Sequence, residues 1–351
     1  MRVLFVTRKY PPRVGGMESL SYGLTTGFPE PKSIIALRRS QKHLVWFLPY
    51  AVARVALTGH RYDVIHLGDA MLCVAGLVPR VLFRRPVAVS VHGLDLTFPH
   101  PLYRAYLRRF LRAEVFIANS DSTRRLAEAR GLAPVRTITI GASPHYFELG
   151  RRPCLDADFE RQRRGRTLLI TVGRLVRRKG VAWFVRHVLP KLSNVLYVVV
   201  GVGPEREEIL RAAAETGMQD NVCLVGKVSD ERLLELLSVS DVFVMPNIEV
   251  PGDVEGFGIV AIEAAAAGVP VVAARLEGIP DAIADGQNGH LVEAGNAAAF
   301  VDALSELASN PEERAKQGER GRAYTEQQNS WPQIIRRYAD LFGRLVAGET
   351  P

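Results

Sequence analysis

The chain has 351 residues, of which 47% are hydrophobic and 23% charged, and this composition suits two globular domains of about 150 residues each. Its three cysteines are far apart and form no CxxC pair, which excludes a disulfide framework and a zinc site and favours a reducing compartment. The net charge of +8 is unevenly distributed: residues 1–150 have 21 Lys/Arg against 9 Asp/Glu, a net of +12, whereas the remainder has 24 against 28, a net of −4.

The first half of the chain alternates short β-branched segments with helical patterns, which predicts parallel βαβ units and a doubly wound sheet. Helices are expected at Leu44–Leu57 and Tyr103–Arg112, among others. The expected strands are Arg2–Thr7, Ser33–Leu37, Val64–Leu67, Val87–Val91, Val115–Ala118 and Arg136–Ile140. The apolar segment Val3–Val6 is too short for a signal peptide, and no segment reaches the ~20 apolar residues of a membrane span.

Residues 148–166 have no strand period and contain Pro, Gly and many charges, which is typical of a linker. The alternation then resumes and predicts a second doubly wound domain, with strands at Leu168–Val172, Leu196–Val200, Val222–Val225, Val242–Met245 and Val269–Ala273. Its helices include Pro204–Ala214, Asp230–Leu237 and Asn296–Leu307. Ser330-Trp331-Pro332 predicts a break before a last helix at Gln333–Val346.

The segment EGFGIVAIE places two carboxylates, Glu255 and Glu263, on either side of a predicted turn into a helix. Because a helix start has unpaired backbone N–H groups, it can bind a phosphate or sugar hydroxyls. Glu263 lies far enough along the helix to accept hydrogen bonds from two adjacent hydroxyls. Its neighbours are small or apolar, which argues against a solvated surface glutamate. Both interpretations, a ligand-binding and a solvated Glu263, stay open.

Three further motifs follow predicted strands, where ligands bind in such sheets. GRLVRRKG places Arg174 and Lys179 where they could hold two phosphates, although the motif by itself favours a plain basic loop before a helix. The pair Gly15-Gly16 permits close approach of backbone to an anion, or simply a turn. His92 could hydrogen-bond a hydroxyl or transfer a proton, or could have a structural role.

Two other strings are set aside. Gly201-Val-Gly203 lacks the third glycine of the dinucleotide-binding fingerprint. The acid pair Asp156 and Asp158 lies in the charged linker and follows no strand, so we expect it to be solvated and expect no metal site.

The order and spacing of these motifs resemble glycosyltransferase family 4, a family of group 1 glycosyltransferases that retain anomeric configuration and have the two-domain GT-B fold. The resemblance spans the chain. Its motifs are Gly15-Gly16, HGLD at 92–95, ANS at 118–120, IGAS at 140–143, GRLVRRKG at 173–180, GVGPE at 201–205, GKVSDERL at 226–233, EGFGIVAIEA at 255–264 and GVPVVA at 268–273.

The resemblance implies a fold and a domain organisation. We expect two Rossmann-like α/β domains facing across a cleft: an acceptor domain at residues 1–160 and a nucleotide-sugar donor domain at residues 161–330. Residues 331–351 would form a helix that crosses back to the first domain.

The resemblance also implies roles for residues. Arg174 and Lys179 would bind the donor diphosphate together with the backbone of Gly15 and Gly16. Glu263 would bind the ribose hydroxyls. The remaining donor contacts would come from the backbone at Lys227 and Val228 for the base, and from Phe257, Gly258 and Ile259 for the sugar. Glu255 and His92 would be the catalytic residues, and neither a cofactor nor a metal is expected.

The substrates are less defined. The stretch PNIEVPGDVEGFGIV favours GDP-mannose as donor, with UDP-sugars as the other candidates. The basic first half and the apolar segment His43–Leu57 allow two interpretations: an ordinary surface over a core helix, or a face for an anionic membrane surface and a lipid-linked acceptor. The predicted location is cytoplasmic, with attachment to the inner face of the membrane as an open option. Nucleic-acid binding is not expected, since no nucleic-acid module is present.

We therefore expect transfer of a hexose from a nucleotide-diphosphate sugar to a lipid-linked or saccharide acceptor, in the synthesis of envelope glycan or glycolipid. The alternatives are a related two-domain nucleotide-sugar epimerase and a non-catalytic nucleotide-sugar-binding relative.

Overall fold

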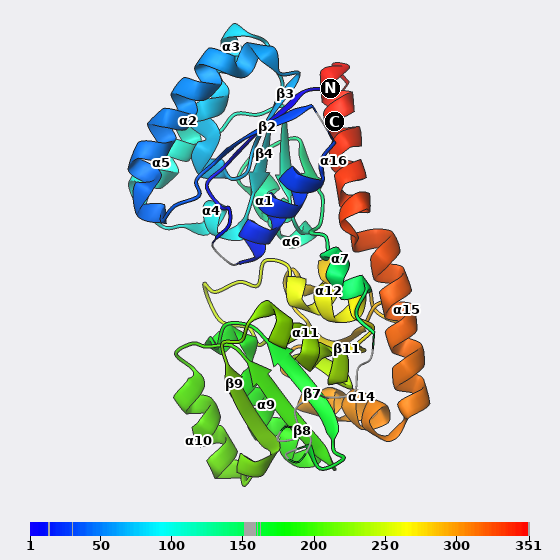
Figure 1. The fold of residues 1–351 in the computed structure, drawn as a ribbon. Helices are drawn as coiled ribbons and strands as arrows, with labels where there is room; N and C mark the ends of the chain where they lie inside the picture. Colours follow the sequence, from blue (N-terminus) through cyan, green and yellow to red (C-terminus); the bar gives the residue numbers. More distant parts are fainter. Residues whose placement is uncertain (13–14, 30, 151–158, 160, 162, 350–351) are drawn as a thin grey trace. The chain divides into compact units, whose positions relative to one another are not determined.

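The computed structural model describes residues 1–12, 15–29, 31–150, 159, 161 and 163–349, and Figure 1 shows its ribbon. The chain divides into two compact units. The first contains Met1–Gly141 and the chain from Trp331 onward, and the second contains Ala142–Ser330. Residues 151–158 of the expected linker, with the acid pair Asp156 and Asp158, lie outside the described residues.

The first unit is built on a parallel six-stranded sheet with the order β2-β1-β3-β4-β5-β6. Its strands are β1 (Val3–Thr7), β2 (Lys32–Ala36), β3 (Val64–Leu67), β4 (Val87–Val91), β5 (Val115–Ala118) and β6 (Val135–Thr137). This is the doubly wound order in which the direction of winding reverses between β1 and β3.

The helices of the first unit cover both faces of this sheet. They are α1 (Gly16–Gly27), α2 (Leu44–Thr58), α3 (Leu77–Leu82), α4 (Gly93–Thr97), α5 (Pro101–Phe110), α6 (Asp121–Ala129) and α16 (Trp331–Val346), with 3-10 turns η1 (Gln41–His43), η2 (Gly59–Arg61) and η3 (Ala70–Gly76). Leu4 and Val6 of β1 join the core that contains α2, η3 and part of α6. Phe5 points to the other face and packs on Phe28 and on Phe342 of α16. Figure 1 shows α16 alongside α1.

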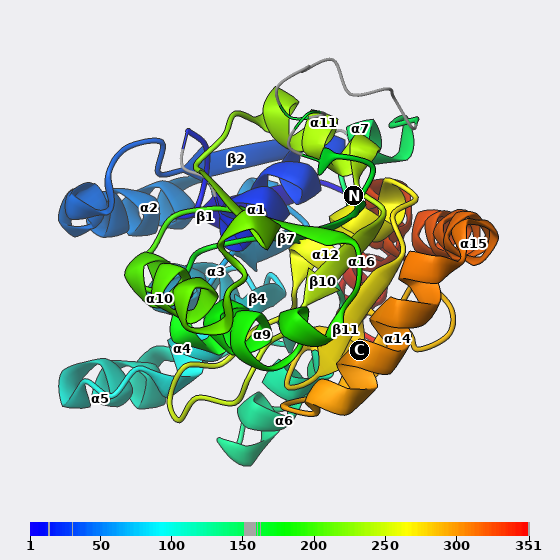
Figure 2. The same cartoon turned by 90° about the horizontal axis from the view of Figure 1, so that it is seen from below.

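The second unit repeats this plan with the order β12-β11-β10-β7-β8-β9, again all parallel. The strands are β7 (Thr167–Val172), β8 (Val195–Val200), β9 (Val222–Gly226), β10 (Val242–Met245), β11 (Val271–Arg275) and β12 (His290–Glu293). The helices are α7 (Pro144–Phe147), α9 (Val181–His187), α10 (Arg206–Thr216), α11 (Asp230–Val239), α12 (Ile259–Ala266), α13 (Ile279–Ala282), α14 (Ala297–Ser309) and α15 (Pro311–Asn329), with 3-10 turns η4 (Arg177–Lys179), η5 (Leu189–Lys191) and η6 (Gln219–Asn221). Figure 2 shows α9 and α10 packed side by side. The prediction of two doubly wound α/β domains is confirmed.

Three details of the sequence prediction differ from the structure. The sixth strand of the second sheet, β12, was not predicted, because HLVE has polar residues at both ends and only two buried apolar residues between them. The last helix begins at Trp331 and not at Gln333, since Pro332 lies in its first turn, where a missing N–H costs no hydrogen bond. The sixth strand of the first sheet ends at Thr137, and Ile140 is buried outside the ladder.

The division between the units falls at residues 141 and 142, earlier than the expected boundary at residue 160. Residues 142–150 are tied to the second unit by hydrogen bonds. The guanidinium of Arg322 on α15 donates to the carbonyl oxygens of Phe147 and Leu149, and the Ala142 N–H donates to the Asn329 oxygen at 2.7 Å. The last helix, α16, belongs to the first unit.

The contact between α1 and α16 gives a matched pair of substitutions. A Cβ added at Gly23 would overlap the indole ring of Trp331, whereas one added at Gly27 would meet only the end of the flexible Ile335 side chain. We expect Gly23→Ala to lower the free energy of unfolding by about 1–3 kcal/mol, because a rigid ring cannot give way in a packed contact. Gly27→Ala should be neutral or slightly stabilising, since alanine favours helix. Thermal unfolding measures both; equal midpoints would contradict the packing.

Candidate active site

The winding of the second sheet reverses between β7 and β10, and the loops after these two strands meet there. The backbone N–H of Ile248, after β10, donates to the carbonyl oxygen of Arg178, after β7, at 3.0 Å. Gly180 has a left-handed φ of 66°, and a Cβ at this position would collide with the carbonyl oxygen of Pro246. Only glycine permits so close an approach, so the chain can bring the basic loop against the acidic one.

Glu255 lies at the centre of this junction and is buried. Its Oε2 is 2.5 Å from the Lys179 Nζ and 3.6 Å from the Arg178 Nε, and it accepts a hydrogen bond from the Asn247 side chain at 3.1 Å. All contacts of this carboxylate that the structure gives are made by Oε2, so Oε1 can accept from a further donor. The Glu255 backbone N–H donates to the carboxylate of Glu277.

The charges at this junction set the protonation of both glutamates. Burial alone would raise the pKa of Glu255, but the ammonium of Lys179 and the guanidinium of Arg178 lower it below its usual value. Glu255 is therefore a carboxylate at neutral pH. Burial and the neighbouring Glu255 charge raise the pKa of Glu277.

Some polar atoms at this junction have no hydrogen-bond partner among the described residues. These buried atoms are the Nε and NH1 of Arg178 and the Oδ1 of Asn247. Both Arg178 nitrogens face a carboxylate at ion-pair distance, whereas the Asn247 Oδ1 has no such partner. Since buried polar groups are nearly always hydrogen-bonded, the Asn247 oxygen favours a polar ligand. The Arg178 guanidinium is also 3.5 Å from the carboxylate of Asp253.

The helix α12 begins at Ile259, three residues beyond Gly256. Its N-cap is Gly258, with φ 85° and ψ 44°, and Phe257 is buried beside it. The first N–H groups of a helix, here at Gly258 and Ile259, have no intrahelical partner and can bind an anion or a hydroxyl oxygen. The sequence-predicted residues Phe257, Gly258 and Ile259 thus lie together with Glu255 and Lys179.

Glu263 is the only charged residue of α12, and the residues around it are buried: Ala261, Ile262, Ala264, Ala265 and Ala266. Its carboxyl group is hydrogen-bonded to the hydroxyl of Tyr146 on α7. Burial raises the pKa of Glu263 to about 8, with a smaller contribution from Asp230, while the Tyr146 hydrogen bond opposes the shift. Glu263 itself is half-buried, and its hydrogen bond to Tyr146 distinguishes it from a fully solvated surface glutamate.

The remaining predicted donor residues of the second unit are more open. Arg174 follows β7 directly, and its side chain is exposed. Lys227 and Val228 follow β9, at the edge of the sheet, and the Lys227 side chain is exposed. None of these residues contacts Glu255 or Glu263 in the contacts that the structure gives.

The first unit holds His92, Gly15 and Gly16. His92 follows β4, is buried, and its Nε2 is 3.2 Å from the carbonyl oxygen of Gly68. A carbonyl only accepts, so Nε2 carries the proton in this contact and Nδ1 can accept. Gly15 is the N-cap of α1, and the Glu18 carboxylate lies beside it, 3.7 Å from the Lys9 Nζ. A negative group of the protein thus already occupies part of this helix start.

A buried charge cluster next to His92 was not found from the sequence. The Arg8 Nε is 2.8 Å from the buried Asp69 carboxylate, and another Arg8 nitrogen is 3.6 Å from Asp95. Burial and the neighbouring Asp69 raise the pKa of Asp95 to about 6, against the opposing effect of His92 and Arg8. Arg8, Asp69 and His92 follow the adjacent strands β1, β3 and β4, so the strand order would have revealed the cluster.

In the second unit, Arg178, Asn247, Glu277 and Tyr146 were not predicted as site residues from the sequence. Asn247 directly follows β10 and Pro246, at the same sheet edge as Lys179, and this position was the available signal. Tyr146 had no such signal, because α7 is distant in sequence from α12. Among the described residues, no group of three or more His, Cys, Asp or Glu side chains could hold a metal ion.

Comparisons with known proteins cover the whole chain. The model of "Glycosyltransferase Family 4" matches residues 1–144, and that of "Glycosyl transferases group 1" matches residues 156–324. A GDP-mannose-dependent alpha-(1-6)-phosphatidylinositol monomannoside mannosyltransferase of Mycolicibacterium smegmatis is 31% identical over 98% of this chain and 99% of its own. The monoacylated-substrate counterpart of Corynebacterium glutamicum is 28% identical over 94% of each chain.

Among solved structures, HepE of Anabaena in complex with UDP superposes with a TM-score of 0.75 at 20% identity, covering 98% of this chain and 100% of that one. At this identity the likeness concerns the fold, and it confirms the GT-B fold expected from the sequence. No helix in the described part of the chain is long and apolar enough to cross a membrane.

The ion pair at the β7–β10 junction can be tested by removing one partner. Lys179→Met leaves the buried Glu255 carboxylate with the more distant Arg178 as counter-charge and with its Asn247 hydrogen bond, and we expect it to lower the free energy of unfolding by about 3 kcal/mol. The double variant with Glu255→Gln should lose less than the sum of the single variants. Arg177→Met, at an exposed position in the same loop, is the control. Additive effects in denaturant unfolding would contradict the pairing.

Glu263 predicts a dependence of stability on pH. Its pKa in the folded protein, about 8, lies above the unfolded value of 4.5, so the native state binds the extra proton between these two values. Stability should therefore fall as pH rises through this window, and the fall should be smaller in Glu263→Gln. The unfolding midpoint measured from pH 5 to about pH 9 checks this. Parallel curves for the two proteins would exclude the effect, and Glu249→Gln, at an exposed position, serves as control.

Proposed function

The chain belongs to glycosyltransferase family 4, and from this premise we propose that it transfers mannose from GDP-mannose to a lipid-linked acceptor, with retention of configuration. The observation that carries the proposal is the similarity to the GDP-mannose-dependent mannosyltransferase of Mycolicibacterium smegmatis, which runs through both units of the chain. UDP-sugars remain the competing donors. Family membership favours transfer over the epimerase and non-catalytic alternatives.

The charges of the second unit suit a nucleotide-diphosphate donor. Three cationic side chains, Arg174, Arg178 and Lys179, come from the single loop after β7, and the start of α12 adds backbone N–H groups. Cations and helix starts stabilise the negative charge that develops on a departing diphosphate. We assign the diphosphate to this loop, and propose that no metal is required for this role.

The two glutamates would have different tasks. Glu255 is fixed through Oε2, and its Oε1 would accept a hydrogen bond from a hydroxyl of the transferred sugar. Glu263, released from its proton, would accept hydrogen bonds from the two ribose hydroxyls. In the first unit, the Nδ1 of His92 would accept from a sugar hydroxyl, since Nε2 is engaged with Gly68. The backbone of Gly16 remains a proposed phosphate contact.

The proposed reaction takes place on one face of the sugar. The bond between the anomeric carbon and the phosphate oxygen breaks, and the acceptor oxygen bonds to the same carbon on the same face. The acceptor proton passes to the departing diphosphate, which leaves as GDP. The cationic loop lowers the energy of this step because negative charge grows on the diphosphate as the bond breaks.

Helix α2 supports a lipid-linked acceptor. One side of it packs in the core through Phe47, Ala51 and Val55. The other side exposes large apolar side chains to solvent: Val45, Trp46, Tyr50 and Leu57. The two interpretations of this segment from sequence thus each describe one side of the helix. An exposed apolar face on a basic domain suits an anionic membrane surface, and we propose peripheral attachment at the inner face of the membrane.

The donor and acceptor can be identified by radiolabel transfer. The protein is incubated with labelled GDP-mannose or labelled UDP-glucose, and with either mannosylated phosphatidylinositol or a free mannoside as acceptor. We expect label in the lipid phase only with GDP-mannose and the lipid acceptor. Faster transfer from UDP-glucose would contradict GDP-mannose as the donor. Transfer to the free mannoside alone would contradict a lipid-linked acceptor.

Variants of the two glutamates test the assignment of roles. Glu255→Gln should lower kcat by on the order of 100-fold, because it alters a contact to the reacting sugar. Glu263→Gln should raise the KM for GDP-mannose by on the order of 10-fold, with a smaller effect on kcat, because it alters a contact to the nucleotide. Glu249→Gln, exposed in the same loop as Glu255, should behave like the parent. The reverse pattern would exchange the two roles.

A further inference from the structure

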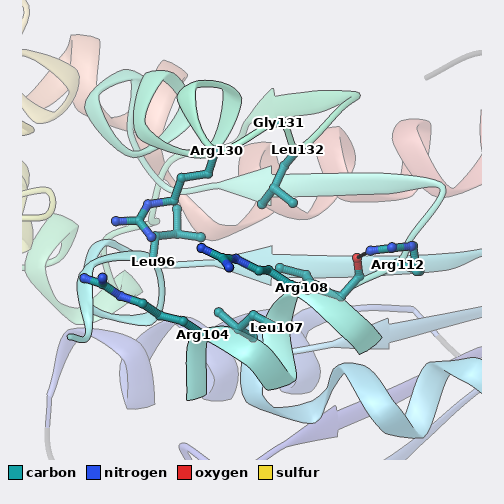
Figure 3. Close-up of a pocket in the computed structure, with 9 residues that line it drawn as sticks. Leu96, Arg104, Leu107, Arg108, Arg112, Arg130, Gly131 and Leu132 are labelled. Atoms are coloured by element: carbon teal, nitrogen blue, oxygen red, sulfur yellow. Dashed lines mark hydrogen bonds between the residues drawn. The ribbon is translucent and has the colours of Figure 1, made fainter. Parts of the chain in front are cut away.

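A cavity of about 450 Å³ lies within the first unit, between α5, the end of α4 and the turn that follows α6. Figure 3 shows the side chains that line it. They are of only two chemical kinds apart from one glycine: the arginines Arg104, Arg108, Arg112 and Arg130, and the leucines Leu96, Leu107, Leu111 and Leu132. Its volume is within the range of cavities that hold small molecules.

The arginines of this cavity have no carboxylate partner among the described residues. The contacts that the structure gives them are to backbone oxygens: Arg104 Nε to Phe98 at 3.4 Å and Arg112 to Leu111 at 2.9 Å. In Figure 3 the guanidinium groups of Arg104, Arg108 and Arg130 gather at one end of the cavity, whereas Arg112 points toward the other end.

The acidic residues near these elements in sequence are engaged elsewhere. Glu128 pairs with Arg124 at 3.0 Å, and Glu114 pairs with Arg80 at 2.7 Å. Three guanidinium groups therefore share one end of a cavity without a neutralising charge from the protein. Like charges that line one cavity repel one another, and an anion bound among them would relieve the repulsion. The planar donor fork of arginine matches the oxygens of a phosphate group.

The leucines define the rest of the ligand. Leu107, and Leu111 at the end of α5, lie on the same side of the helix as Arg104 and Arg108. The apolar part of the cavity lining is therefore contiguous with the cationic part. A free inorganic ion would use only the arginine end. A molecule that joins a phosphate to a hydrocarbon portion would use both ends.

We propose that this cavity binds a phosphate ester that carries an apolar chain, with the phosphate held by Arg104, Arg108 and Arg130 and the chain against the leucines. The ligand can be a phospholipid of a membrane or a soluble phosphate ester of the same chemistry. This ligand class includes the lipid-linked acceptor of the proposed transfer reaction, but the binding requires no sugar donor and can be measured without the reaction.

Titration calorimetry with the whole protein tests the proposal, with short-chain dihexanoyl phosphatidic acid as soluble probe. The triple variant Arg104→Gln, Arg108→Gln, Arg130→Gln should bind it on the order of 100-fold more weakly than the parent. The cavity arginines are exposed, as are the control positions, which lie outside the cavity lining. The control triple variant Arg54→Gln, Arg109→Gln, Arg125→Gln removes the same charge from the same unit and should bind within about twofold of the parent. Equal loss in both triple variants, or no binding by the parent, would overturn the proposal.

Two further probes separate the sources of the phosphate. Inorganic phosphate should bind far more weakly than the short-chain lipid; equal affinity would overturn the role of the leucines. Flotation with phosphatidylcholine vesicles that contain phosphatidic acid tests the membrane source, where the cavity variant should float less than the control variant. If the two variants float equally but differ in their affinity for the short-chain lipid in calorimetry, the ligand of the cavity is the soluble phosphate ester.

A measurement on the unmodified protein covers the case in which the triple variant does not fold. Phenylglyoxal modifies arginine side chains, and mass spectrometry locates the modified residues. The short-chain lipid should slow modification of Arg104, Arg108 and Arg130 several-fold and leave Arg109 and Arg125 unchanged. Uniform modification with and without the lipid would contradict the site.

Discussion

The ion pair between Lys179 and Glu255 fixes the geometry of the second unit at the point where its sheet reverses. Two loops of opposite charge follow β7 and β10, and each would carry buried, unpaired charge without the other. Their pairing keeps Glu255 ionised and leaves one of its oxygens able to accept. It also brings Glu255 to the start of α12, where backbone N–H groups are unpaired. The proposed donor chemistry depends on this junction, because it positions a carboxylate, cations and a helix start within one short stretch of structure.

The first unit applies the same topological rule with a different result. Arg8, Asp69 and His92 follow three adjacent strands and form a buried cluster with Asp95. Here two acids share one guanidinium, and Asp95 has a raised pKa. The second unit has the opposite balance, with two cations around one carboxylate. The sheet order thus determines where polar residues meet, while the loop sequences determine which charge dominates.

Much of this architecture could be predicted from sequence, because alternating apolar strands and helical patterns are local signals. Glu255, Lys179 and Glu263 could be found because each lies at or near a strand end or helix start that the sequence displays. Arg178 and Asn247 were missed because their roles arise from a contact between two loops that are 60 or more residues apart in the chain. Tyr146 could not be found, since its hydrogen bond to Glu263 requires the path of the chain after residue 141. The strand β12 was missed because only its two middle residues are apolar and buried, whereas predicted strands of the same length are apolar and buried throughout or nearly so.

The membership of α16 in the first unit has a consequence for biosynthesis. The ribosome makes residues 142–330, the whole second unit, before it makes α16. Until then, the face of the first sheet that contains Phe5, Phe28 and His66 lacks the aromatic rings of Tyr338 and Phe342. The nascent chain therefore exposes an apolar face of the first sheet throughout most of its translation. Chaperones that recognise exposed aromatic groups would find their target there, and the second unit can complete its fold before the first does.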